Sequence, residues 1–152
     1  MSLETSYRTA IVIPKTQLVS DAANIKERVR PGSASLENLK RAMEIVIKNR
    51  GGEFDTAYSD NEGRRKECFL AIRTGDFPRG AGVQVEADGK VTFHYDAYGD
   101  STQIGRSICD EIDQNFTVIA VMKYQNKHGF QVEVDEKPTS KNTKRVTITG
   151  VI

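Results

Sequence analysis

The chain has 152 residues, the length of one ordinary domain, and a near-equal balance of 22 basic and 21 acidic side chains. A net charge of +1 argues against a role that depends on a large basic excess, such as coating nucleic acid or an anionic membrane surface. With 38% hydrophobic and 28% charged residues, the composition is typical of a folded globular protein. We therefore expect one domain over residues 4–152, with residues 1–3 a remnant of cloning.

Neither a membrane span nor a secretion signal is visible in the sequence. The longest apolar run, residues 10–13, is far shorter than the roughly 20 residues that cross a bilayer. The two cysteines, Cys68 and Cys109, lie in apolar patterns, which predicts buried, reduced thiols and a cytoplasmic location. One disulfide between these cysteines is the alternative.

The chain opens with a predicted strand and a long connection. Residues 7–13 are rich in β-branched side chains and stop at Pro14, as a strand does. The following residues, 15–32, are too many for a plain loop. They predict a short helix over residues 21–29, with Asp21 as its cap.

The next segment gives the clearest helical pattern. Apolar residues recur at steps of three and four and form one stripe: Leu36, Leu39, Met43, Val46 and Ile47. The hydroxyl of Ser33 or Ser35 is expected to cap the first turn, and Gly51-Gly52 to end the helix. Beyond it we predict strands over residues 53–58 and 68–72, a polar turn over 60–65 and a loop over 75–80.

The hairpin that follows can be placed in register from the sequence. A two-residue turn at Asp88-Gly89 would put the apolar side chains of the two strands on opposite faces of the sheet. A three-residue loop, Ala87-Asp88-Gly89, instead pairs Val85 with Val91 and puts both apolar sets on one face. This loop ends in a left-handed residue, so we predict a positive φ at Gly89.

A second long helix and two strands complete the chain. Asp100 or Ser101 is expected to cap the helix, whose apolar pattern runs to about Lys127. The β-branched residues within 115–118 predict a kink or break there. The closing strands are predicted over residues 130–134 and 146–151.

This order of elements predicts an α+β domain. Most neighbouring strands are joined by short links, which implies antiparallel pairing. We expect a single antiparallel or mixed sheet with two main helices on one face, and the ferredoxin-like, split βαβ arrangement is the nearest named plan. Such a sheet has two edges, through which a homodimer could form.

Several segments together are similar to a known family. They are the opening Tyr7-Arg8-Thr9, the hairpin Gly82–Tyr95 with its Asp88-Gly89 turn, the segment Asp96-Ala97-Tyr98-Gly99, and Met122-Lys123 through Gly129-Phe130-Gln131-Val132. They resemble the family of the domain of unknown function 1257, to which the plastid hypothetical open-reading-frame 35 proteins belong. The resemblance covers most of residues 7–150 and leaves residues 15–32 as an insertion. It implies a small α+β domain with no established activity and an accessory role beside an AAA-type ATPase.

The sequence contains no G-x-S-x-G, H-E-x-x-H or P-loop motif. We therefore favour a non-enzymatic accessory domain that binds another protein and needs no cofactor. Polar and aromatic side chains cluster beside glycines around the second strand of the hairpin. This cluster is the predicted contact surface and comprises Arg79, His94, Asp96 and Tyr98.

Two alternatives use other residues. A nucleic-acid binder would use two local basic clusters, one formed by Arg64, Arg65 and Lys66 and the other by Lys141, Lys144 and Arg145. The near-neutral net charge makes nucleic acid the less favoured partner. A metal-dependent enzyme would use His94, Asp96 and Asp100, although a solvated strand face with Asp100 as a helix cap is the favoured explanation of these three residues.

Overall fold

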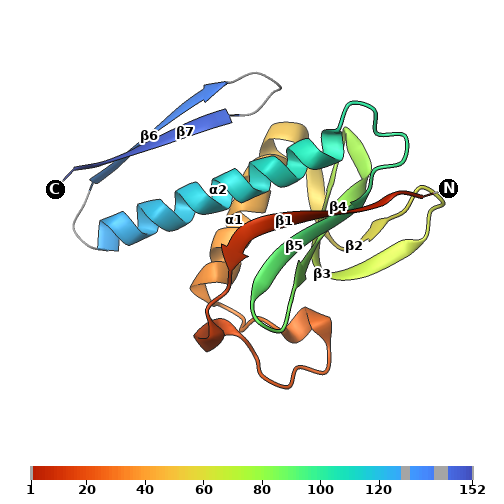
Figure 1. Cartoon of the computed structure of the whole chain (residues 1–152), viewed down its shortest axis with the longest axis horizontal. Coiled ribbons are helices and arrows are strands. Elements are labelled where there is room, and N and C mark those ends of the chain that lie inside the picture. Colours follow the sequence, from red (N-terminus) through yellow and green to blue (C-terminus); the bar gives the residue numbers. More distant parts are fainter. Residues whose placement is uncertain (1, 128–130, 139–143, 152) are drawn as a thin grey trace.

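The computed structural model of the chain describes residues 2–127, 131–138 and 144–151. In chain order the elements are β1 (Glu4–Val12), α1 (Ala34–Arg50), β2 (Gly52–Ser59), β3 (Arg65–Thr74), β4 (Phe77–Val85), β5 (Lys90–Asp96), α2 (Ile104–Lys127), β6 (Gln131–Pro138) and β7 (Lys144–Val151). Figure 1 shows the two helices crossing the sheet formed by the first five strands. Within the described residues no helix is both long and apolar enough to span a bilayer.

The main sheet is antiparallel throughout and has the strand order β1-β5-β4-β3-β2. This confirms the predicted α+β class with an antiparallel sheet and two main helices. The ferredoxin-like plan is not confirmed, because four strands lie between the two helices where that plan has two. Strands β6 and β7 pair with each other in a separate two-stranded sheet.

One apolar core lies between the sheet and both helices. Among its most deeply buried members are Leu39, Met43 and Val46 from α1, Val83, Val85, Val91 and Phe93 from β4 and β5, and Ile108 and Ile112 from α2. The stripe predicted on α1 is therefore its buried face. Burial of each such side chain stabilises the fold by about 1.5–3 kcal/mol before the entropy of ordering is subtracted.

The β4–β5 hairpin has the predicted register. Val85 pairs with Val91, and the N–H of Gly89 donates to the Glu86 carbonyl at 2.9 Å. Gly89 has φ +93°, as predicted for the three-residue loop. A Cβ at Gly89 would also lie 2.2 Å from the carbonyl oxygen of Ile13, so glycine is required here by packing as well as by φ.

The connection between β1 and α1 differs from the prediction. The structure has two short 3₁₀ turns, at Lys15–Gln17 and Ile25–Glu27, instead of a helix over residues 21–29. Asp21 is not a cap, because it has a left-handed φ of +60° and Asn24 caps the second turn.

The start of α1 is capped from outside the helix. Ser33 occupies the N-cap position, but its side chain makes no capping hydrogen bond, so that prediction is wrong. The N–H of Ser35 donates instead to Oε1 of Gln17 at 2.9 Å. Residues 15–32 therefore stabilise the helix that follows them. At the other end, Gly51 has φ +74° and ends α1 as predicted.

Two further boundaries differ from the predictions. Residues 77–80 belong to β4 and not to a loop, because Phe77 already pairs with Thr74 of β3. Helix α2 runs without a break through residues 115–118, although β-branched residues are frequent there. Its predicted cap is confirmed, since the two carboxylate oxygens of Asp100 accept from the N–H groups of Ile104 and Gly105, each at 2.9 Å.

The sheet curls so that its two outermost strands meet. The hydroxyl of Tyr58 in β2 donates to Glu4 of β1 at 2.8 Å, although three strands lie between β2 and β1 in the sheet. The Tyr58 ring packs with Cys68 over Gly82, where a Cβ would lie within 2.8 Å of both side chains. The curl brings the β2–β3 turn to the end of β5, where the candidate site lies.

Candidate functional site

Asp96, the last residue of β5, has a fully buried carboxylate that accepts three backbone N–H groups. Its Oδ1 accepts from Leu3 at 2.8 Å and from Tyr98 at 2.9 Å, and its Oδ2 accepts from Asn61 at 2.8 Å. The bond to Tyr98 is an Asx turn, which forms locally when an Asp ends a strand. These three hydrogen bonds, the Asp96 network, tie together the start of β1, the β2–β3 turn and the β5–α2 connection.

The β2–β3 turn is also stabilised from within. The buried carboxylate of Asp60 accepts from the backbone N–H groups of Glu62 and Arg64, at 2.9 and 2.8 Å. The Arg64 guanidinium donates to the same carboxylate at 2.8 Å. This side-chain bond, aided by the two backbone donors, lowers the pKa of Asp60 to about 2. The turn therefore presents Asn61 to the Asp96 network in a fixed conformation.

Around the buried Asp96 carboxylate lies a surface that we name the loop face, formed by Leu3, Asn61, Arg79 and Tyr98. The side chains of Leu3 and Tyr98 are 57% and 42% exposed. The Arg79 guanidinium lies 5.3 Å from the centre of the Phe77 ring, and its Nη1 is 3.8 Å from Asp96 Oδ1. An apolar and an aromatic residue are therefore exposed at one hydrogen-bonded backbone junction, and the largely buried Arg79 lies against its carboxylate.

The structure brings together three of the four residues of the predicted contact surface. Arg79 and Tyr98 both contact Asp96, as the sequence suggested. Asp96 itself is a correction, because its carboxylate is buried and serves to hold the surface, not to contact a partner. His94 lies two residues back along β5, where its ring nitrogens pair with the hydroxyls of Ser6 and Thr92. Burial lowers the pKa of His94 and favours its neutral form.

The alternative metal site is not assembled. The carboxylate of Asp96 is committed to backbone N–H groups, and that of Asp100 caps α2. Both ring nitrogens of His94 hydrogen-bond to hydroxyl groups, those of Ser6 and Thr92. Across residues 2–127, 131–138 and 144–151, no group of three His, Cys, Asp or Glu side chains is placed to hold an ion.

The first basic cluster is largely neutralised by nearby carboxylates. Arg64 forms ion pairs with Asp60 at 2.8 Å and Glu62 at 2.9 Å. Arg65 pairs with Asp55 at 3.3 Å, and Lys66 is half-buried. Of the second cluster, Lys141 lies outside the described residues, and Lys144 and Arg145 are placed only as the first two positions of β7. Arg64 and Arg65 therefore offer little unpaired positive charge to a phosphate backbone.

Both cysteines are buried and unbridged, as predicted. Burial raises the pKa of Cys68 to about 11 and that of Cys109 well above its ordinary value, so neither thiol is activated as a nucleophile. We expect a thiol reagent such as dithionitrobenzoate to modify neither cysteine in the native protein and both in denaturant. Rapid modification of a native thiol would contradict this burial, and no modification in denaturant would indicate a disulfide.

Two members of the loop face are not predicted by the sequence. Leu3 falls in the expected cloning remnant, yet its N–H donates to Asp96 and its carbonyl accepts from Ala97 at 2.9 Å. Asn61 is expected only as part of a polar turn. The one local signal is Asp96 itself, because an Asp at a strand end commonly accepts backbone N–H groups.

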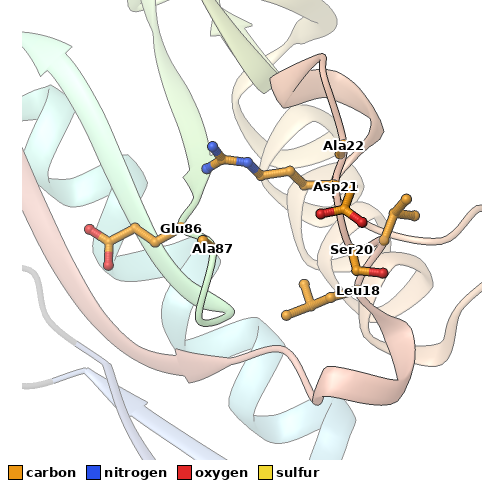
Figure 2. A pocket seen from close by; sticks show the side chains of 8 residues that line it. Leu18, Ser20, Asp21, Ala22, Glu86 and Ala87 are labelled. Carbon is orange, nitrogen blue, oxygen red and sulfur yellow. The ribbon is translucent and has the colours of Figure 1, made fainter.

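A hollow of about 260 Å³ lies between the β1–α1 connection and the tip of the β4–β5 hairpin. Figure 2 shows Leu18 reaching from the connection into this space, while Glu86 on the hairpin points away from it. The Arg28 guanidinium is committed to the Val85 carbonyl at 2.7 Å. The residues that line this hollow therefore fasten the β1–α1 connection to the β4–β5 hairpin, and they indicate no particular ligand.

Comparison with known proteins adds no relative. No family model, no curated protein and no solved structure matches the chain. The geometry of the loop face is thus the basis on which a function can be proposed.

Proposed function

We propose that this chain is a small, non-enzymatic accessory domain that binds another protein through the loop face. The observation that supports the proposal is the position of Leu3 and Tyr98. Both are exposed, and both are fixed by backbone hydrogen bonds to the buried Asp96. Tyr and Arg are enriched among the residues that dominate binding energy, and the partly exposed Arg79 lies 3.8 Å from the Asp96 carboxylate. A surface whose backbone is already held by hydrogen bonds loses less conformational entropy on binding.

The alternatives are less well supported by the same geometry. Arg64 and Arg65 are paired with carboxylates, so a nucleic acid would first have to displace those ion pairs. The buried thiols and the committed Asp96 carboxylate provide no nucleophile or metal ligand set. We include in the proposal a cytoplasmic location and, from the resemblance to the family described above, an AAA-type ATPase as the partner.

The proposal is tested by purifying the tagged full-length chain from its native cells and identifying what is retained. The decisive variant is the double substitution Leu3→Ala with Tyr98→Ala, because both residues engage Asp96 only through backbone N–H groups that alanine keeps. The matched control is Tyr124→Ala, which removes another exposed tyrosine, on α2.

We expect the wild-type chain and the control to retain the same partner in similar amounts. The double variant should retain at least about tenfold less of that partner, because truncating central contact residues weakens binding strongly. Thermal unfolding must first show that the variants are folded. If the folded double variant retains every partner in undiminished amount, the loop face is not the contact surface.

A further inference from the structure

A second feature of the fold is the outer edge of β2, which no described strand covers. The N–H of Gly75 donates to the Gly51 carbonyl at 2.8 Å, which fixes the alternation of hydrogen bonds between β2 and β3. By that alternation the N–H and C=O groups of Gly52 and Phe54 point away from β3. Beyond Asp55 the register shifts, and the N–H of Thr56 is accepted by the Asp55 side chain at 2.6 Å. The available edge is therefore short and lies at the start of β2.

This short edge lies beside a hollow. A space of about 440 Å³ separates the end of α1 from the start of β2, and Ile47 and Phe54 are among its apolar lining residues. Phe54 pairs with the core residue Ile72, so its ring lies on the helix side of the sheet, yet the residue is 37% exposed. A second hollow of about 360 Å³ shares Gly52 and Glu53 with the first. Apolar surface thus lies next to backbone groups that can pair with a strand.

The hollow is lined by two cations, Arg41 and Lys48, and two anions, Glu44 and Glu53, of which Lys48 alone has no ion-pair partner in the described part of the chain. Arg41 pairs with Glu44 at 3.4 Å, and Glu53 pairs with Arg73 at 3.4 Å. Lys48, an exposed residue near the end of α1, also lines the hollow. Among the described residues no carboxylate forms an ion pair with it. An acidic side chain entering the hollow would therefore meet one unpaired positive charge.

We propose that the start of β2 binds an extended acidic segment of a partner protein as an additional strand. The segment pairs its backbone with Gly52 and Phe54, places an apolar side chain against the Phe54 ring, and directs a carboxylate to Lys48. Strand addition of this kind takes affinity from main-chain hydrogen bonds and specificity from alternate side chains. This surface shares no residue with the loop face, so an experiment can contradict one of the two proposed binding sites and leave the other supported.

The test uses a library of random linear heptapeptides displayed on phage and selected on the full-length chain. Enriched peptides are then synthesised, and their dissociation constants are measured by fluorescence anisotropy. Lys48→Glu reverses the unpaired charge, and Lys40→Glu makes the same change at an exposed position earlier on α1. Phe54→Pro removes an outward N–H, which an edge strand tolerates. Phe54→Thr removes the ring but keeps that N–H. This variant replaces Phe54→Pro in the test if the proline variant is unfolded.

We expect enriched peptides to combine acidic and β-forming residues and to shift the backbone amide NMR signals of Gly52 and Phe54. Lys48→Glu should weaken binding at least about tenfold and Lys40→Glu less than about twofold. Phe54→Pro should abolish binding, and Phe54→Thr should weaken it. The proposal is overturned if no peptide is enriched, or if enriched peptides bind the Lys48 and Phe54 variants as tightly as the wild type. It is also overturned if the wild type forms a dimer that Phe54→Pro abolishes, since the occupant would then be a second copy of the chain.

Discussion

Replacing Asp96 with alanine is expected to lower the free energy of unfolding by about 3–5 kcal/mol, among the largest losses for any single polar residue of this chain. The substitution removes the carboxylate that accepts the N–H groups of Leu3, Asn61 and Tyr98. Each hydrogen bond to a charged group contributes about 1.5–3 kcal/mol, and water at the rim recovers part of the loss. Urea unfolding at neutral pH measures the difference.

The matched control for this prediction is Asp88→Ala in the β4–β5 turn. The Asp88 side chain is 57% exposed and accepts one backbone N–H, from Lys90 at 3.1 Å. We expect this control to lose less than about 1 kcal/mol, because water replaces an exposed acceptor readily. Equal losses for the two alanine variants would show that Asp96 does not hold three segments together.

The same carboxylate predicts a pH dependence. Burial alone would raise the pKa of Asp96, but the three backbone donors and the charge of Arg79 outweigh burial and lower it. A carboxyl group with a lowered pKa contributes stability above its unfolded pKa of about 3.9, and this contribution is lost as the pH falls further. We expect the wild type to lose stability below about pH 4 more steeply than Asp96→Asn, measured by urea unfolding across that range. Identical slopes would contradict the prediction.

Replacing Gly89 with alanine is expected to lower the free energy of unfolding by at least about 3 kcal/mol, measured by urea unfolding. A left-handed φ of +93° costs a residue with a Cβ about 1–2 kcal/mol. The added Cβ would in addition lie 2.2 Å from the Ile13 carbonyl, so backbone must move, and Gly89 itself accepts from the Ile13 N–H at 2.8 Å.

Gly99→Ala provides the control, because Gly99 has φ +75° and a Cβ added there would meet no atom within 4 Å beyond its chain neighbours. We expect the free energy of unfolding of this control to fall by only about 1–2 kcal/mol, the cost of holding a residue with a Cβ at a left-handed φ. If both glycine variants lose the same amount, the contact between the hairpin tip and the end of β1 is not as tight as the structure indicates.

Local patterns account for what the sequence could predict of the fold. The register of the β4–β5 hairpin follows from alternation and one glycine, and the buried face of α1 follows from a helical stripe. The cap of α2 by Asp100 is likewise a contact between residues four and five positions apart. The cap of α1 could not be found in this way, because Gln17 is 18 residues from Ser35.

The candidate site was predictable only in part, for the same physical reason. Arg79, Asp96 and Tyr98 were grouped because polar and aromatic side chains cluster beside glycines around the hairpin. The role of Asp96 depends on Leu3 and Asn61, which are 93 and 35 residues away in the chain. Those contacts require the sheet to curl until Tyr58 reaches Glu4, and no residue pattern specifies that curl.

The central claim, that the loop face contacts a partner protein, is tested most directly by site-specific photo-crosslinking in native cells. A photoreactive phenylalanine analogue is placed at Tyr98 in one sample and at Tyr124, which is 61% exposed, in another. The claim predicts a crosslinked partner from position 98 and none from position 124. Crosslinks from position 124 alone, or none from position 98 while the wild-type chain still retains its partner, would contradict it.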